Sequence, residues 1–451
     1  MKKLLSICLM IGLLISLAAC ATPATTAPTT APDTTTTQGS TTPAETTVPK
    51  SPKTISFLSM WAEEHENSKL VMDLTSEYQK DYPEFKVEFE MVPSTDLIQK
   101  LQLYFATQET PELFATGGDI KALIKTGELL NISETFGELG IMNIFDEAAL
   151  QFDISKGGQD DLYTIPMGMN IEGFWYNKKI FTENNIAVPA TWDELFTISE
   201  ALLAKGIQPL VVGGKDRWPI TRYLYAYIMR DMGPDALIKA RAGTVAFTDP
   251  AFARAAQNLV TMVNKGYFGQ GINSLDLSST VSMFFNGQSA MIYNGSWFVA
   301  DLNNPEKNIL GEDGVGFFPV PTVAGGKGKI TDYNVNTGNS LALSAKKYDA
   351  QVGDWARFVF TQLGQKAMDE YGALKGYKVT YDEAKLKPYT KLLFAEMKKI
   401  EGTGFWFEFG FDTTTTQLAL NNGQLLVLGE ISPEDYFKQI GDSWAANRTD
   451  K

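Results

Sequence analysis

A low-complexity stretch between residues 21 and 53 most constrains how this chain can fold. It contains 13 Thr, 6 Pro and 5 Ala among its 33 residues and has no aromatic side chain. Such a composition cannot bury enough apolar surface to offset the entropy that is lost on ordering. We expect a flexible tether with a root-mean-square span of about 30 Å. Because the chain has 451 residues, the part that follows is long enough to form more than one domain.

The first twenty residues, MKKLLSICLMIGLLISLAAC, have the pattern of a targeting segment. Two lysines precede a short apolar run, and small residues follow it, as in a secretory signal peptide. The run is short for a transmembrane helix, although an uncleaved anchor helix is the alternative interpretation. Residues 17–20, Leu-Ala-Ala-Cys, resemble a bacterial lipobox.

The resemblance to a lipobox implies how the mature protein is held. It predicts a signal peptide over residues 1–19, cleavage before Cys20, and acylation of the Cys20 thiol and of the new amino terminus. Several acyl chains on one residue give a stable anchor, whereas a single chain binds only marginally. We therefore expect a lipoprotein of a Gram-positive bacterium. Its tether, residues 20–53, would hold the folded part at the extracytoplasmic face of the cell membrane.

Cysteine and histidine are almost absent. The two cysteines, Cys8 and Cys20, both lie in the N-terminal segment, and His65 is the single histidine. These counts exclude a disulfide framework, a cysteine nucleophile, and zinc sites built on cysteine or on several histidines. The sequence also has no Walker A, GxSxG or GxGxxG motif. We therefore expect no metal and no cofactor. Catalysis by paired carboxylates and pure binding both remain open.

The charge of the chain argues against a nucleic-acid partner. There are 53 acidic against 39 basic residues, which gives a formal net charge of −14. A polyanion would be repelled by this surface, because binding to it depends on clustered lysines and arginines.

Local patterns after residue 53 alternate between strand and helix. Residues 54–61 are apolar and β-prone, residues 68–82 have apolar side chains at helical spacing, and residues 85–92 alternate with period two. A helix over 96–107 and a strand over 111–116 continue this order, which is typical of an α/β domain with a mainly parallel sheet. A strand is also predicted over residues 209–212, and helices over residues 192–205, 222–231, 250–265, 349–371 and 432–444.

Five motif regions occur in order along the folded part. They are DLYTIP, YNKKIF and VPATWDEL within residues 161–195, FNGQSAMIYNGSW at 285–297, GFFPVP at 316–321, WARF at 355–358 with Gln365 after it, and ISPED at 431–435. In this order they resemble the extracellular solute-binding proteins of bacterial carbohydrate ABC importers, the maltose-binding-protein-like family.

That resemblance implies a two-lobe periplasmic-binding-protein fold of type II. The ligand would lie between two α/β lobes joined by a hinge of several crossings, and the lobes would close on it. By analogy, the first lobe comprises residues 54–167 and 296–343, and the second comprises residues 168–295 and 344–446. The candidate hinge segments are residues 166–171, 291–295 and 343–347.

A sugar site needs aromatic faces for the apolar side of the ring. Trp297 belongs to the NGSW motif, which matches the stacking tryptophan of the family, with a core tryptophan as the alternative. Trp61 ends the first predicted strand, where the family often has an aromatic residue, although core packing would also explain it. Trp406 lies in the aromatic cluster FWFEFGFD, residues 405–412, which resembles a sugar-stacking cluster of the family.

Other candidates would supply hydrogen bonds to hydroxyl groups. Trp218 and Asp216 share a Gly-rich loop, residues 213–219, where the family often contributes contacts. Asp119 would bind a sugar hydroxyl or cap the next helix.

Two further pairs of candidates rest on position relative to the family. His65 and Glu66 lie near the place of a charged sugar-binding pair, but the residue types differ, and a solvated surface histidine is the alternative. Asn170 takes the place of a family glutamate, with Glu172 nearby. An amide can both donate to and accept from hydroxyl groups.

The sequence thus predicts a non-enzymatic, monomeric receptor that captures a mono- or oligosaccharide and delivers it to the permease subunits of an ABC transporter. Two alternatives remain. One is a surface carbohydrate-active enzyme with a carboxylate pair, and the other is a receptor of the same fold for a non-sugar solute such as an amino-acid derivative or a polyamine.

Overall fold

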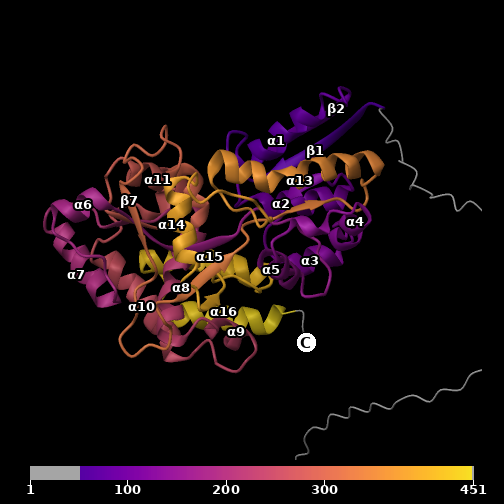
Figure 1. Ribbon diagram of the computed structural model, residues 1–451. Coiled ribbons are helices and arrows are strands. Elements are labelled where there is room, and N and C mark those ends of the chain that lie inside the picture. The colour runs from indigo at the N-terminus through magenta and orange to yellow at the C-terminus, as the bar shows by residue number, and fades with distance from the viewer. Residues whose placement is uncertain (1–50, 449–451) are drawn as a thin grey trace, which may run out of the picture. The chain divides into compact units, whose positions relative to one another are not determined.

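Two β-sheets organise residues 51–448, the part of the chain that this computed structural model describes (Figure 1). One sheet has four strands. The other has six, of which five follow one another as neighbours and the sixth pairs beside them. The predicted signal peptide, the predicted lipidation site Cys20 and residues 20–50 of the predicted tether lie outside the described residues.

The four-stranded sheet confirms the order of elements predicted for the N-terminal part. β1 (Lys53–Ser59) pairs in parallel with β2 (Phe85–Met91) and with β3 (Leu113–Ala115). α1 (Glu66–Tyr78) and α2 (Leu97–Thr107) connect these strands, because parallel neighbours need a crossover. β9 (Leu341–Leu343) joins β3 in antiparallel orientation, which gives the order β2-β1-β3-β9.

Helices from two distant parts of the chain cover this sheet. They share one hydrophobic core and comprise α1, α2, α3 (Ile120–Lys125), α4 (Ile132–Glu138), α5 (Glu147–Gly157) and α13 (Ala350–Tyr371), with a short 3-10 turn η1 (Met142–Ile144). α13 lies beside α1, as Figure 1 shows. Trp355 of α13 is fully buried in this core, and its indole Nε1 donates to Thr75 Oγ1 of α1 at 3.0 Å.

The second sheet is mixed. Its order is β10 (Gly402–Gly404), β8 (Asp332–Asn336), β4 (Asn170–Asn177), β6 (Met291–Gly295) and β5 (Leu210–Val211), and β7 (Val315–Phe318) also pairs with β4. β4 is antiparallel to β6, β7 and β8, whereas β10–β8 and β5–β6 are parallel. The mainly parallel arrangement therefore describes only the first sheet.

Each face of the second sheet has its own core, because successive side chains of a strand point to opposite faces. Phe174 of β4 belongs to one core and Trp175, the next residue, to the other. The Phe174 side takes up α6 (Lys178–Glu183), α7 (Trp192–Leu203), α8 (Trp218–Met232), α9 (Ala236–Arg241), α10 (Pro250–Asn264), α15 (Thr413–Leu428) and α16 (Pro433–Asn447). The Trp175 side takes up α11 (Leu277–Phe285), α12 (Val299–Leu302) and α14 (Pro388–Met397). Three 3-10 turns complete the elements: η2 (Gly214–Asp216), η3 (Ile272–Ser274) and η4 (Ser296–Phe298).

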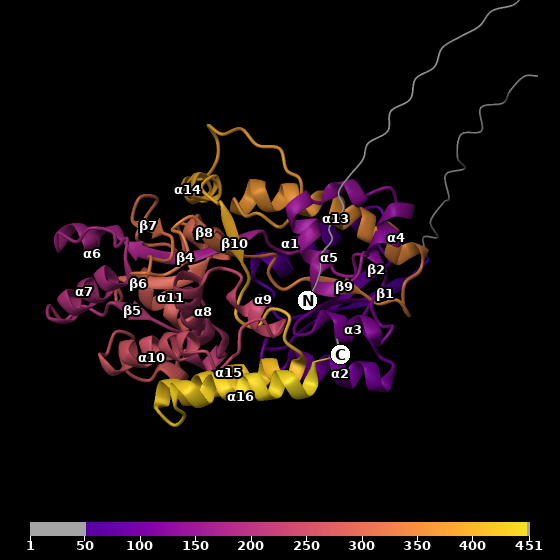
Figure 2. The same cartoon turned by 90° about the horizontal axis from the view of Figure 1, so that it is seen from below.

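Most predicted elements of this half are present. α7, α8 and α10, with β5, occupy the predicted positions within a few residues. α16 is also found, and it lies beside α15 along its length (Figure 2). α15 was not predicted, because its first turn is the polar run Thr413–Thr416 and carries no apolar periodicity. Its N-cap Asp412 instead starts the helix by accepting a hydrogen bond from the backbone N–H of Thr415.

Strand pairing and core membership differ from the predicted partition. Residues 296–336, expected in the first lobe, carry β7 and β8 of the second sheet. Residues 344–371, expected in the second lobe, carry α13, which packs into the core of the first sheet. The predicted lobes rest on an analogy with the order of segments along the chain of the family. Strand pairing depends instead on which strand edges and apolar faces meet.

The predicted hinge segments change with this grouping. β6, residues 291–295, pairs on both sides within the second sheet and makes no crossing, and residues 343–347 join β9 to α13 within the first group. The chain passes between sheets after Ile165, which bridges to Leu341 of β9, and enters β4 at Asn170, close to the predicted segment 166–171. It returns through residues 337–340, between β8 and β9.

Candidate functional site

Three adjacent strands of the second sheet, β8, β4 and β6, bring polar side chains together at one end of the strands. Asn170 and Glu172 of β4 lie directly opposite Asn336 and Asn334 of β8, and Glu172 also lies opposite Gly295 of β6. β6 and β8 end here, and β5 leads from the same edge into the loop before α8. In α/β sheets, ligands bind outside the carboxyl ends of strands.

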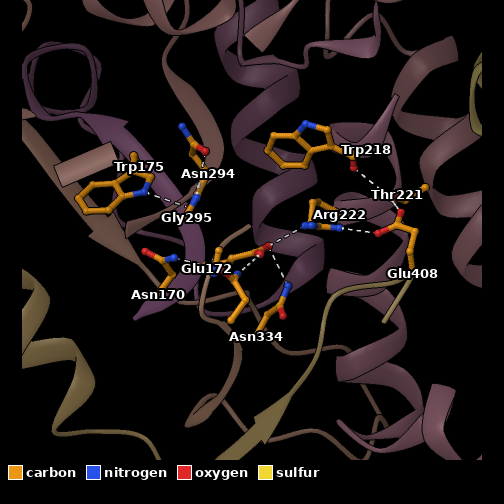
Figure 3. A network of polar contacts seen from close by, with 12 residues as sticks. Asn170, Glu172, Trp175, Trp218, Thr221, Arg222, Asn294, Gly295, Asn334 and Glu408 are labelled. Atoms are coloured by element: carbon orange, nitrogen blue, oxygen red, sulfur yellow. Dashed lines mark hydrogen bonds and ion pairs between the residues drawn. The ribbon is translucent and has the colours of Figure 1, made fainter. Parts of the chain in front are cut away.

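Glu172 is the centre of a buried polar network (Figure 3). Asn334 Nδ2 donates to its Oε2 at 2.7 Å, and Asn336 Nδ2 donates to its Oε1 at 2.8 Å. The two asparagines can both reach it because residues two apart in a strand share a face. The Glu172 side chain is 0% exposed, so both carboxylate oxygens are occupied from within the protein.

Arg222 of α8 joins this carboxylate to a second one. Its Nε lies 3.2 Å from Glu172 Oε2, and its Nη1 donates to Glu408 Oε2 at 2.9 Å. Thr221 Oγ1 donates to the other oxygen of Glu408. One guanidinium therefore serves two buried carboxylates. Burial raises the pKa of Glu172 and the negative charge of Glu408 adds to the rise, against the lowering effect of Arg222.

Two predicted tryptophans meet above this network. Trp218 precedes Arg222 by one turn of α8, and the Arg222 Cζ lies 5.0 Å from the centroid of its ring (Figure 3). The rings of Trp218 and Trp297 are 5.9 Å apart, centroid to centroid, at 72°. Both side chains are only partly buried. Gly295 makes this possible, because a Cβ there would lie 2.0 Å from the Trp297 ring.

Asn170 links the network to the turn that carries Trp297. Its Nδ2 donates to Asn336 Oδ1 at 3.1 Å, and its Oδ1 accepts from Ser296 Oγ at 3.2 Å. Ser296 begins η4, so the residue before Trp297 is held by the strand that carries Glu172. The structure thus brings together four of the predicted residues, namely Asn170, Glu172, Trp218 and Trp297.

Asp216 lies two residues before Trp218 but its carboxylate faces another element. Its Oδ2 accepts from the backbone N–H of Leu277 at 2.7 Å, at the start of α11. Burial raises its pKa, and Asp276 contributes. Asp216 therefore anchors the loop on which Trp218 lies.

Trp406 belongs to a cluster of partly buried aromatic rings. Its ring lies 5.9 Å from that of Phe152 in α5 and 5.0 Å from that of Phe409. Phe405 contacts the same two neighbours. The strand ends at Gly404, so the aromatics at 405–409 follow it in a turn and do not alternate within a strand. Glu408, in this same turn, is the partner of Arg222.

Trp61, His65 and Glu66 form a second group at the start of α1. The Trp61 and His65 rings stack with centroids 6.1 Å apart. His65 is the N-cap of α1, where its Nδ1 accepts from the backbone N–H of Asn67 at 3.2 Å. Glu66 is buried and pairs with the equally buried Lys375 at 3.1 Å.

The pKa values of this second group shift together. Burial lowers the pKa of His65, and Lys375 adds to the effect while Glu66 opposes it. Burial would raise the pKa of Glu66, but Lys375 and His65 outweigh it and hold that pKa below its usual range. The capping bond to Asn67 and the stacking on Trp61 distinguish His65 from a freely solvated histidine.

Asp119 lies apart from both groups. It is the N-cap of α3, and its Oδ1 accepts from the backbone N–H of Ala122 at 3.2 Å. The capping role that the sequence allowed is therefore present.

Five residues of these two groups were not predicted from the sequence, and four of them had a weak local signal. Arg222 follows Trp218 by one helical turn, and Glu408 is the only charged residue within residues 405–411. Asn334 and Asn336 alternate with the apolar side chains of Tyr333 and Val335 in β8. Lys375 had no such signal, because its partner Glu66 lies 309 residues away in the chain.

The two sheets, the aromatic pair and the amide-rich strand ends define an α/β protein with a surface suited to binding a solute. The chain belongs to the bacterial extracellular solute-binding protein family, which it matches over residues 61–366.

Individual relatives agree with this assignment. An uncharacterized ABC transporter extracellular-binding protein of Pyrococcus horikoshii is 26% identical over 259 residues, 56% of this chain and 57% of that protein, so the match spans little more than half of its length. The multiple sugar-binding protein of Streptococcus mutans is 22% identical over 372 residues, 78% of this chain and 84% of that protein.

A solved structure of a chitin oligosaccharide binding protein superposes with a TM-score of 0.77. It is 23% identical, and the match covers 87% of this chain and 98% of that one. Structural similarity at 23% sequence identity shows that the two chains share a fold. The predicted α/β fold of the two-lobe class is therefore confirmed. None of the helices within residues 51–448 has the length and apolar character of a membrane span.

Proposed function

We propose that this chain is a receptor that captures a sugar or an oligosaccharide and delivers it to an ABC transporter permease. One observation carries the proposal. Trp218 and Trp297 meet edge to face at 5.9 Å, partly exposed, beside the amide-rich ends of three strands. Flat apolar rings next to hydrogen-bonding groups suit a pyranose, which has C–H faces and hydroxyl edges.

The charges at this edge favour a neutral ligand over an ionic one. The side chains of Glu172, Arg222 and Glu408 are 0%, 11% and 7% exposed, and they pair with one another. An amino-acid derivative or a polyamine would have to break these pairs to find a counter-ion, at the cost of leaving a buried charge unpaired. A saccharide would leave them intact.

Among the ten predicted contact residues, we propose different roles. Trp218, Trp297 and Asn170 would face the ligand, while Glu172 would act by orienting the asparagines and Arg222. Trp61, His65 and Glu66 would form a second contact surface, and Asp119, Asp216 and Trp406 stay as candidates whose observed contacts are also structural.

Further proposals concern the whole protein. We propose lobes defined by the sheets, with residues 54–165 and 341–378 in the first and residues 170–336 and 388–446 in the second, and closure about the crossings between them. We also propose a monomer without enzymatic activity. The lipobox-like residues 17–20 support a lipid anchor at Cys20 on the extracytoplasmic face of the membrane of a Gram-positive bacterium.

Calorimetric titration tests the proposal with chitotriose, xylotriose and raffinose, and with spermidine as the charged control. We expect a stoichiometric heat with at least one saccharide and none with spermidine. Heat with spermidine alone would indicate that the solute is a cation and not a sugar. Chromatography of the same mixtures would show products if the chain were a carbohydrate-active enzyme.

Replacing one aromatic ring tests the site. We expect Trp297→Ala to weaken saccharide binding by about 1–3 kcal/mol, from the loss of an aromatic contact. Tyr381→Ala is the matched control, because Tyr381 is a 47% exposed aromatic residue that stacks on Phe394, outside the candidate site. If both variants bind the saccharide as tightly as the unaltered protein does, Trp297 does not contact the ligand.

A further inference from the structure

Arg222 has an unusual position for a buried cation. It lies between Glu172, a carboxylate near the start of the central strand β4, and Glu408, a carboxylate from the turn after β10. Because Nε and Nη1 of the planar guanidinium each face a different carboxylate, the plane of the group is set by two elements that lie far apart in the chain.

The Trp218 ring rests against this guanidinium. The Arg222 Cζ lies 5.0 Å from the ring centroid, within the range of a cation–π contact. The other neighbour is the Trp297 ring, which meets it at 72°. Figure 3 shows the Trp218 ring next to Arg222, and the charge bridge to Glu408 on the side away from Glu172.

The backbone before Trp218 is also constrained. Arg217 has a φ of +67°, a left-handed conformation that costs energy for a residue with a side chain. Its Nη1 donates to Gln417 Oε1 at 3.1 Å and to Asn421 Oδ1 at 2.7 Å, both in α15. These bonds fix where Trp218 enters α8, and they leave the orientation of its ring to the contacts with Arg222 and Trp297.

We propose that Arg222 is a positioning residue, which holds the Trp218 ring against Trp297 through the bridge from Glu172 to Glu408. Arg222 itself does not touch the solute. The turn at 405–412 thereby helps to shape the aromatic surface through Glu408, although it contributes no ring to that pair. The consequence for saccharide affinity rests on the proposed function, whereas the ring geometry does not.

Circular dichroism of the ligand-free, full-length protein tests the geometry. Two indoles 5.9 Å apart at 72° couple their electronic transitions and produce a pair of bands of opposite sign in the far ultraviolet. Trp218→Phe and Trp297→Phe each remove one partner and identify this couplet in the spectrum. We expect Arg222→Met to reduce its amplitude by at least half.

Two further variants separate positioning from folding. The triple variant Glu172→Gln, Arg222→Met, Glu408→Gln leaves no buried charge unpaired, and we expect it to fold and to lack the couplet. Arg230→Met is the matched control on the same helix. Arg230 is 0% exposed and donates to the backbone oxygens of Val320 and Ile330, so we expect this variant to lose stability and keep the couplet.

Binding of chitotriose, xylotriose and raffinose by the same variants gives the second readout. We expect affinity for the saccharide that binds the unaltered protein to fall about tenfold in the triple variant, because a displaced ring loses its stacking contact. A couplet that is lost as expected in a protein that binds none of the three sugars would support the positioning role and contradict the proposed function. The absence of a couplet from the unaltered protein, or an unchanged couplet in the triple variant, would overturn the positioning role.

Discussion

Two buried charge clusters combine carboxylates and a cation in different proportions. At the start of α1, one carboxylate, Glu66, pairs with one ammonium, Lys375. At the edge of the second sheet, two carboxylates, Glu172 and Glu408, share the guanidinium of Arg222. The pKa of Glu66 is lowered, whereas the pKa of Glu172 is raised.

This contrast shows that burial alone does not set the direction of a pKa shift. Desolvation opposes ionisation of both glutamates. Lys375 outweighs it at Glu66, where it has no second carboxylate to serve. At Glu172 the charge of Glu408 takes up part of the attraction of Arg222, and desolvation prevails. Arg222 contacts the Trp218 ring, and Glu66 contacts His65, which stacks on Trp61. Both clusters therefore lie next to the proposed binding surfaces.

Removing the cation from each cluster should have the largest effect on the free energy of unfolding. We expect Arg222→Met to lower the free energy of unfolding by about 5 kcal/mol and Lys375→Met by about 3 kcal/mol, because breaking a buried pair leaves its charged partners without compensation. Arg222 leaves two such partners and Lys375 one. Urea unfolding followed by circular dichroism measures both, and an equal or larger loss for Lys375→Met would contradict the argument from proportions.

Removing the second carboxylate should change the pH dependence of stability. The raised pKa of Glu172 means that its folded form binds a proton more tightly than the unfolded form does, so its contribution to stability is lost as pH rises through that pKa. Glu408→Gln removes one cause of the rise and keeps a hydrogen-bond acceptor for Thr221. We expect the loss of stability, as pH rises above the ordinary glutamate value, to be smaller than in the unaltered protein.

The matched control for that measurement is Glu434→Gln, an exposed position in the first turn of α16. Its pH profile should follow that of the unaltered protein. A profile of Glu408→Gln that coincides with the control would mean that Glu408 does not act on Glu172.

Replacing His65 should have the smallest effect on stability. Its pH dependence has the opposite sign to that of Glu172. A lowered pKa means that the unfolded state binds the proton more tightly, so stability is lost as pH falls below the ordinary value of 6.5. The groups that act on His65 are Glu66, Lys375, Asp301 and Lys307. His65→Asn keeps a side-chain acceptor at the N-cap of α1 and removes the titration, so its stability should fall less between pH 7 and pH 5. Parallel slopes for both proteins would show that His65 titrates as in the unfolded chain.

Local patterns were enough for much of the fold. Period-two alternation located β2, and apolar spacing located α1, α7 and α10, because these signals come from residues close together in the chain. α15 was missed since its first turn is a run of threonines. The NGSW motif and the Gly-rich loop pointed to Trp297 and Trp218, but neither motif indicates that the two rings meet.

The sequence by itself determined the α/β class, the absence of cysteine after residue 20, and the family. Each follows from composition or from the order of short motifs. Only the tertiary structure decided which strands share a sheet, where the chain crosses between sheets, and which charges pair. Arg222 and Glu408 are 186 residues apart, and their contact depends on α8 and the turn after β10 packing together. No local pattern encodes such a contact, because the free energy that forms it is shared by the whole core.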